Sequence, residues 1–226
     1  MDDDDAARLT ILFICTGNVH RSPLAERLLA ARLPEARVGS AGTRARHIAG
    51  MHPATGSVLK QLGGNSARFT SRLLRPELVA EADLVLGLER EHRETAVRLW
   101  PVALRKCFTV REFLRLAHGE AVAPREMIAR AAAARGSLAP VERAADGIAD
   151  PWGASYDVLL TCGREIDEAA AELAGMLAEV QPVRPTNLPP PKGEPLGQVP
   201  QCTAGQIDRL RVDKHAKLLA GTGDLG

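Results

Sequence analysis

The stretch LTILFICTGNVHRSPLAERLL, residues 9–29, decides the fold. Its first part, residues 9–14, is a short and continuous apolar run, which is typical of a strand buried on both faces of a parallel sheet. A glycine-containing loop follows, and Ser22-Pro23 then supplies an N-cap and a first helical residue. Leucines recur at helical spacing after that point, so a helix is predicted over residues 23–33. Cys15 therefore lies where a buried strand ends and a loop leads into a helix.

The rest of the chain alternates strands with helices. The predicted strands are 37–40, 83–88 and 107–110, and the predicted helices are 53–62, 76–82, 89–100, 111–116 and 155–180. This alternation predicts an α/β fold: a single domain with a four-stranded parallel sheet, helices on both faces, and a phosphate loop after the first strand. Ligands of such folds bind at the carboxyl ends of the strands, which is where Cys15 stands.

Composition shifts divide the chain into three parts. We expect a disordered acidic start over residues 1–7, one domain over 8–180, and a Pro-rich tail over 181–226. The tail is expected to be mostly disordered, with a short helix at 207–219. Residues 123–143 are predicted to form a helical insert with solvated arginines.

Charge and cysteine content exclude several classes of protein. A net charge of +1 and 3% aromatic residues argue against a nucleic-acid partner and against a membrane surface. The cysteines include no C-x-x-C pair, so a structural zinc site is not expected. Scattered cysteines suit a reducing compartment, and the chain shows neither a signal peptide nor a membrane-spanning run. A cytoplasmic protein is therefore predicted.

The loop after the first strand has the features of an anion site. Cys15 and Arg21 bracket it, and between them lie Thr16, Gly17, Asn18, Val19 and His20. Backbone N–H groups at the start of a helix attract anions, and an arginine can hold two phosphate oxygens. Gly17 and Asn18 tolerate the left-handed conformations that a tight loop needs.

The positive electrostatic potential of the helix start and of Arg21 also favours the thiolate form of Cys15, which is the nucleophilic form. Ser22 is placed to donate a hydrogen bond to that thiolate. The alternative is a buried cysteine at a strand end beside a solvated arginine. The strand before the loop, the helix after it and the Gly-Asn pair inside it favour the functional interpretation.

Transfer of a phosphoryl group to a thiolate also needs an acid for the leaving group. Asp150 is the candidate, in the segment IADPWG over residues 148–153. Asp-Pro is also a common start of an ordinary turn, so the assignment depends on its pairing with the Cys15 loop. Together, Cys15, Arg21 and Asp150 predict a phosphomonoester hydrolase.

These motifs resemble the low-molecular-weight protein tyrosine phosphatases, whose loop has the pattern C-x5-R-S and whose acid lies in a late Asp-Pro. The likeness covers about residues 9–177, including SAG at 40–42 and DLVL at 83–86. It implies hydrolysis of phosphotyrosine in a protein substrate through a phosphocysteine on Cys15, with no metal and no other cofactor. Arg21 would bind the phosphate, and Asp150 would act first as acid and then as base. Asn18 would hold the shape of the loop, and Ser22 would help the thiolate leave.

The chain departs from the family pattern around the pocket. His20 stands where many members carry a second, protective cysteine, and we expect it at the rim rather than as a catalytic base. Residues 44–48, RARHI, replace an aromatic wall of the phosphotyrosine slot. His47 and Trp152 are expected to line the pocket, although Trp152 has the alternative of packing under the loop. Phe69 takes a place often held by a histidine that braces the loop.

Thr16 leaves a second substrate open. The run CTGN at 15–18 and the segment DPWGAS at 150–155 resemble the protein arginine phosphatase branch. The resemblance implies that the Thr16 hydroxyl favours phosphoarginine by narrowing the pocket and orienting the attacking water. The alternative is a threonine that only fills a loop position.

Two other classes remain open. A thioredoxin-coupled arsenate reductase shares this fold but needs two further cysteines midway along the chain, where Cys107 is alone. A non-catalytic phosphate-binding module is disfavoured by the intact Cys, Arg and Asp set, although the tail leaves room for a binding partner. His52, His92 and His118 lack ligand spacing and are expected at the surface.

Overall fold

The computed structural model describes residues 8–119, 122–137 and 146–178. The expectations for the start, 1–7, and for the tail, 181–226 with its helix at 207–219, concern residues outside these ranges. Part of the insert at 123–143 also lies outside them. The proposed domain boundaries therefore stay predictions.

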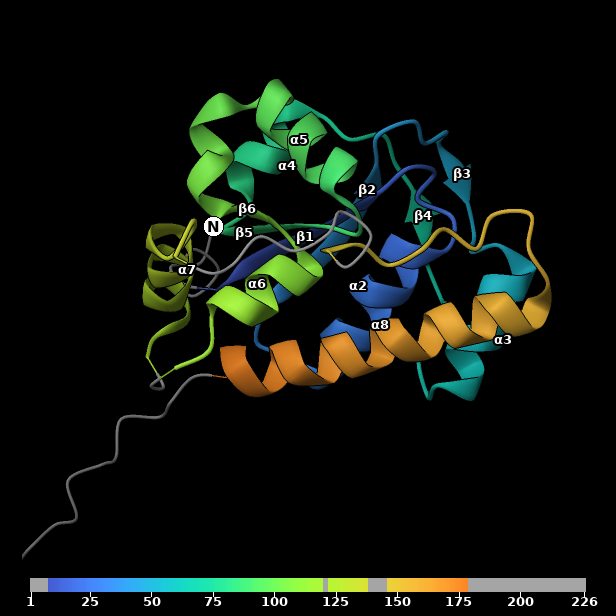
Figure 1. The fold of residues 1–226 in the computed structure, drawn as a ribbon. Coiled ribbons are helices and arrows are strands. Elements are labelled where there is room, and N and C mark those ends of the chain that lie inside the picture. Colours follow the sequence, from blue (N-terminus) through green and yellow to red (C-terminus); the bar gives the residue numbers. More distant parts are fainter. Residues whose placement is uncertain (1–7, 120–121, 138–145, 179–226) are drawn as a thin grey trace, which may run out of the picture. The chain divides into compact units, whose positions relative to one another are not determined.

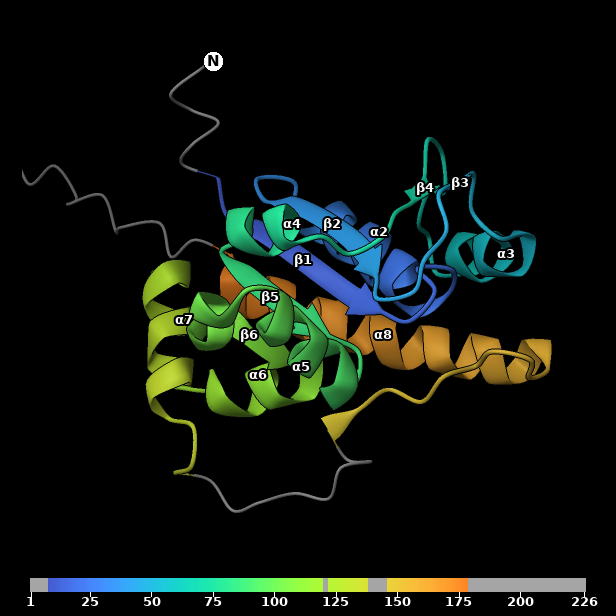
Figure 2. The same ribbon diagram turned by 90° about the horizontal axis from the view of Figure 1, so that it is seen from above.

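The central sheet has four parallel strands in the order β2-β1-β5-β6 (Figures 1 and 2). They are β1 (Thr10–Cys15), β2 (Arg37–Gly42), β5 (Leu84–Gly87) and β6 (Cys107–Thr109). All four predicted strands are confirmed, and with them the predicted α/β fold class. A second, antiparallel pair, β3 (Ile48–Ala49) with β4 (Thr70–Ser71), was not predicted, because two-residue strands carry no detectable periodicity.

Helices follow the strands as the alternation predicts. They are α2 (Arg21–Arg32), α3 (Pro53–Gln61), α4 (Pro76–Glu81), α5 (Arg90–Leu99), α6 (Val110–Leu116), α7 (Pro124–Ala133), α8 (Tyr156–Leu177) and the 3-10 helix η1 (Pro101–Lys106). Helix α7 confirms helical structure within the insert. Across the described ranges, no helix combines the length and the apolar character that crossing a bilayer requires.

Strand β1 is buried on both faces, which explains its unbroken apolar sequence. Ile11 and Phe13 belong to the core formed with α2 and α8, whereas Leu12 and Ile14 belong to a second core on the α4 and α5 side. Figures 1 and 2 show these helix pairs on opposite faces of the sheet. Each such side chain contributes about 1.5–3 kcal/mol of stability when fully buried, so the strand that ends in the site is firmly held.

The start of α2 differs from the prediction. Ser22 was expected to cap a helix beginning at residue 23, but α2 begins at Arg21 with His20 at the N-cap position. The Ser22 hydroxyl donates to Cys15 Sγ instead of capping the helix. Arg21 and Ser22 therefore both lie in the first turn of α2, and both are buried.

Strand order brings the functional residues to one edge. β1 continues to β2 on one side and borders β5 on the other, so Cys15 stands at the point where the strand order reverses. Gly42 is paired with Cys15 across the sheet. A Cβ on Gly42 would lie 2.7 Å from both Asn18 N and Thr16 O, so only glycine lets β2 approach the loop this closely.

Candidate active site

Cys15 is the last residue of β1 and is 3% exposed. Its Sγ atom accepts hydrogen bonds from the Asn18 backbone N–H at 3.2 Å and from Ser22 Oγ at 3.0 Å. The hydrogen bond expected from Ser22 is therefore present. Two donors are therefore directed at one sulfur, where they can stabilise negative charge that develops during a reaction.

Asn18 fixes the shape of the loop. It is fully buried and adopts a left-handed backbone with φ of 52°, whereas Gly17, which was expected to share this role, does not. Its Nδ2 donates to Ser22 Oγ at 2.9 Å and to Ser40 Oγ at 2.8 Å. Its Oδ1 accepts from the Arg72 backbone N–H at 2.9 Å. The side chain thus ties the loop to α2 and β2, and to the chain that follows β4.

Arg21 is 1% exposed, and carboxylates on two segments hold it. Its Nη1 donates to Glu89 Oε2 at 2.7 Å and to the Ile148 carbonyl at 2.9 Å. Its Nη2 forms an ion pair with Asp150 Oδ2 at 2.8 Å. Among the described residues, its buried Nε has no hydrogen-bond partner. The guanidinium is therefore fixed in direction, and its Nε–H remains available as a donor.

Cys15, Arg21 and Asp150 open on the same cavity, which has a volume of about 450 Å³. The other residues that line it are Thr16, Gly17, Val19, His20, Arg44, Arg46, Ile48 and Trp152. Trp152 is 69% exposed, so it lines the opening and does not pack under the loop. His47, which was expected in the pocket, is exposed and is not one of the lining residues, whereas its neighbours Arg46 and Ile48 are.

His92 was expected at the surface, and this prediction is wrong: the residue is 3% exposed. The Glu89 backbone N–H donates to its Nδ1 at 3.0 Å, so the proton of the neutral ring is on Nε2, 3.0 Å from Thr16 Oγ1. Burial, with a smaller effect of the Arg21 charge, lowers the pKa of His92 to about 4. A neutral His92 thus donates to Thr16 and leaves the Thr16 hydroxyl proton free for another acceptor.

His20 lies at the rim, as expected. Thr55 Oγ1 donates to the Val19 carbonyl at 3.1 Å and lies 2.6 Å from His20 Nδ1, so His20 donates from Nδ1. Its ring centroid is 5.7 Å from that of Trp152. Burial and the nearby His52 lower the pKa of His20, which favours an uncharged ring beside the cavity. The residue supports the wall that Trp152 forms. His52 itself is exposed, and so is His118, as the sequence predicts.

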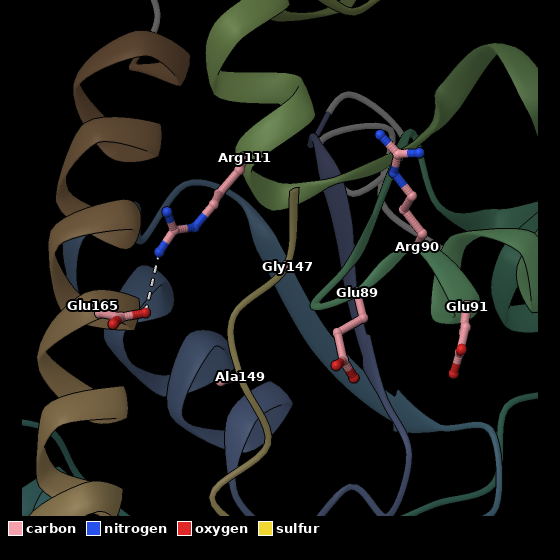
Figure 3. A pocket seen from close by; sticks show the side chains of 7 residues that line it. All are labelled: Glu89, Arg90, Glu91, Arg111, Gly147, Ala149 and Glu165. Carbon is pink, nitrogen blue, oxygen red and sulfur yellow. Dashed lines mark hydrogen bonds and ion pairs between the residues drawn. The ribbon is translucent and has the colours of Figure 1, made fainter. Parts of the chain in front are cut away.

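Glu89 was missed by the sequence analysis. It lies two residues after the end of β5, at the sheet edge where Cys15 lies, and that position was the available signal. Its carboxylate also faces a second cavity of about 470 Å³ (Figure 3). In this view, Gly147 and Ala149 lie between Glu89 and the ion pair of Arg111 with Glu165, whose atoms are 3.1 Å apart. Glu89 therefore supports Arg21 from behind the active-site cavity.

The other described cysteines are poor nucleophiles. Cys107 and Cys162 are buried free thiols, and burial raises the pKa of Cys107 to about 11 and that of Cys162 to about 12.

Phe69, which stands where a histidine often braces the loop, is buried. The Arg72 backbone and Ser40 brace the loop here, through their hydrogen bonds to Asn18. Within the described ranges, no three His, Cys, Asp or Glu side chains are grouped as a metal site.

Comparison with known proteins agrees with this geometry. The family model for low molecular weight phosphotyrosine protein phosphatase matches residues 10–126. The chain is 36% identical over 93 residues to the probable low molecular weight protein-tyrosine-phosphatase AmsI of Erwinia amylovora, an alignment that covers 41% of this chain and 64% of that protein. It is 36% identical over 115 residues to the protein-arginine-phosphatase of Geobacillus stearothermophilus, covering 50% of this chain and 77% of the relative.

A solved structure extends the likeness to the fold. The YwlE arginine phosphatase from Geobacillus stearothermophilus superposes with a TM-score of 0.58 at 29% identity. The superposition covers 75% of this chain and 92% of that one. The family model spans more than half of the chain, and the expected resemblance is confirmed. The chain belongs to the low molecular weight phosphotyrosine protein phosphatase family.

Proposed function

We propose that this chain is a protein phosphatase that hydrolyses phosphotyrosine through a phosphocysteine on Cys15, with Asp150 as general acid and base. The observation that carries the proposal is the shared cavity, in which Cys15, Arg21 and Asp150 face the same space. A nucleophile, an anion clamp and a proton donor are the groups that cysteine-based phosphate ester hydrolysis requires.

In the first step, the phosphate enters between the loop N–H groups and the Arg21 guanidinium. The Cys15 sulfur attacks phosphorus, and the bond from phosphorus to the tyrosine oxygen breaks. The phosphate replaces Asp150 as the partner of Arg21, and the Asp150 carboxyl, in its protonated form, gives its proton to that oxygen, so the substrate leaves as a neutral phenol. Arg21, which Glu89 already holds in place, and the loop donors balance the charge on the phosphoryl oxygens throughout.

In the second step, water attacks the phosphocysteine. Asp150, now ionised, takes a proton from that water, and the bond from sulfur to phosphorus breaks. The hydrogen bonds from Ser22 and from the Asn18 N–H stabilise the departing thiolate, because both are already directed at Sγ. Inorganic phosphate is released, and Cys15 returns to its initial form.

The test is hydrolysis of p-nitrophenyl phosphate and of a phosphotyrosine peptide by the purified protein. Cys15→Ser should abolish both activities. Asp150→Asn should slow hydrolysis of the peptide far more than hydrolysis of p-nitrophenyl phosphate. The tyrosine oxygen is a poor leaving group, whereas p-nitrophenolate needs little protonation to leave. An inactive wild-type protein, or full activity of Cys15→Ser, would refute the proposal.

The runner-up is protein arginine phosphatase, favoured by the similarity to the Geobacillus enzyme. The Thr16 hydroxyl lines the cavity and can donate to a substrate or to water, because His92 supplies its other hydrogen bond. Turnover of phosphoarginine and of phosphotyrosine should be compared in the wild type and in Thr16→Ile. Equal rates that do not respond to Thr16→Ile would remove the arginine alternative.

The remaining alternatives have direct tests. Apart from Cys15, the cysteines in the described ranges are Cys107 and Cys162, and their raised pKa values make both poor relay thiols for an arsenate reductase. Thioredoxin-dependent arsenate turnover would restore that alternative. We keep a cytoplasmic location as part of the proposal, to be checked by fractionation. Comparing the full chain with one ending at Pro182 tests whether the tail affects turnover or binds a partner.

A further inference from the structure

One wall of the active-site opening is formed by the short segment between β2 and β3. Its backbone is held at both ends. The Arg44 N–H donates to the Thr16 carbonyl at 2.8 Å, and the Arg46 carbonyl accepts from Ser71 Oγ at 2.6 Å. Ser71 is itself buried, with 4% of its surface exposed. The positions of Arg44 and Arg46 relative to the catalytic loop are therefore fixed by the fold.

The guanidinium groups of Arg44 and Arg46 differ in their surroundings from those of most other described arginines. Both are exposed and both line the cavity that contains Cys15. Within the described part of the chain, neither guanidinium has a carboxylate partner or a side-chain hydrogen bond. By contrast, Arg21 and Arg135 are each paired with glutamates. Two uncompensated positive charges therefore stand at the entrance to a phosphate site.

The neighbouring walls are apolar. Ile48, on the same segment, is 52% exposed, and Trp152 on the Asp150 loop is 69% exposed. Both line the cavity. The site thus has an anion cradle at its base, apolar contacts for a ring along its sides, and a cationic rim.

The only carboxylate lining this cavity among the described residues does not neutralise that rim. Asp150 is already paired with Arg21, through atoms 2.8 Å apart. A substrate that brings a second negative charge to the rim gains from Arg44 and Arg46, whereas one that brings a positive charge is repelled. A lysine-flanked peptide falls in the second group.

We propose that Arg44 and Arg46 select phosphotyrosines whose neighbouring residues are aspartate or glutamate. This inference rests on the proposed phosphatase function and adds the class of peptide that the site prefers. The arginines are specificity-determining residues and take no part in the chemical steps. Their contribution is electrostatic, so it acts mainly on kcat/KM and weakens as salt increases.

The experiment compares three phosphotyrosine peptides of equal length, with glutamate, glutamine or lysine on both sides of the phosphotyrosine. In the wild type, kcat/KM should be about tenfold higher for the glutamate peptide than for the glutamine peptide at low salt, as expected for two exposed ion pairs. Arg44→Ala and Arg46→Ala should each reduce this ratio about threefold, and the double variant should bring it close to one. The variant with Arg44→Glu and Arg46→Glu should prefer the lysine peptide.

Arg105→Ala is the matched control, because Arg105 is an exposed arginine in η1 that does not line the cavity. It should keep the wild-type ratio. A wild type that hydrolyses p-nitrophenyl phosphate but treats the three peptides alike would overturn this inference and leave the phosphatase proposal standing. A ratio that survives in the double variant would also overturn it. A wild type inactive on every substrate would instead reject the proposed function.

Discussion

Glu89 Oε2 lies 2.7 Å from Nη1 of Arg21 and so helps to fix the direction of the guanidinium. Arg21 is buried, and a charged hydrogen bond to a buried group contributes about 1.5–3 kcal/mol. Glu89→Ala should therefore lower kcat/KM for p-nitrophenyl phosphate about tenfold. Glu89→Gln, which keeps an acceptor oxygen, should recover part of that loss.

Glu91→Ala is the control for this prediction. Glu91 is exposed and lines the same second cavity, but Arg21 is bonded to Glu89 and not to Glu91. It should leave kcat/KM unchanged. Equal effects of Glu89→Ala and Glu91→Ala would mean that the charge of the second cavity, and not the contact with Arg21, matters.

Ser22→Ala removes one of the two hydrogen bonds to Cys15 Sγ. The thiolate should be less stabilised, so alkylation by iodoacetamide at pH 7 should slow about tenfold, in line with the loss of one charge-assisted hydrogen bond. Breakdown of the phosphocysteine should slow as well, which burst kinetics would detect. Ser57→Ala, at an exposed site where the hydroxyl donates to the Pro53 carbonyl, should change neither rate.

Asn18→Ala should destabilise the fold. The substitution places alanine at a φ of 52° and leaves three partners, on Ser22, Ser40 and Arg72, without their hydrogen bonds to the side chain. The sum of a left-handed backbone cost and unsatisfied buried groups is about 3 kcal/mol in the free energy of unfolding. Urea denaturation measures it. Asn65→Ala, at an exposed site, should cost less than about 1 kcal/mol, and a similar loss at both sites would contradict the role given to Asn18.

His92 should make stability depend on pH in a defined window. Its pKa is about 4 in the folded protein, below the ordinary value of 6.5, so the unfolded chain takes up the proton first as pH falls. The stabilisation is complete above pH 6.5 and is lost as pH falls toward 4, by about 3 kcal/mol in all.

Urea unfolding at several pH values between 7.5 and 4 tests this, with His92→Gln as the comparison. The variant should be less stable at pH 7.5 but should lose less stability on acidification. Parallel pH profiles for the two proteins would show that His92 does not carry the effect.

The sequence predicted most of the sheet because its signals are local. The apolar run before Cys15 and the strand at 83–88 are buried on both faces. Such strands are continuous apolar runs, so they can be recognised in the sequence without knowing which strands they pair with. The site was predicted where one motif holds its residues together, from Cys15 to Ser22. Asp150 was chosen because a proton donor was needed and an Asp-Pro loop was available; the structure places it on the cavity that Cys15 lines, and its role as the acid stays a proposal.

What the sequence did not reveal depends on contacts between distant segments. His92 was misplaced because an amphipathic helix with exposed neighbours gives no sign that one polar residue turns toward Thr16, 76 positions earlier. Ser22 looked like a helix cap because Ser-Pro is a common helix start, and only the position of the sulfur shows otherwise. His47 was chosen within a short exposed loop, where alternate residues point in different directions.

Gly42 sets a condition for transplanting this chemistry. Designers who wish to install the loop of residues 15–21 in another parallel sheet cannot carry over that peptide alone. The neighbouring strand must end in a residue without a side chain at the position opposite the cysteine, because any Cβ there would press on the loop backbone at 2.7 Å. The smallest unit that can be transferred is therefore the loop with the ends of two adjacent strands. A sheet chosen to receive it should first be searched for a glycine at the strand end beside the new loop.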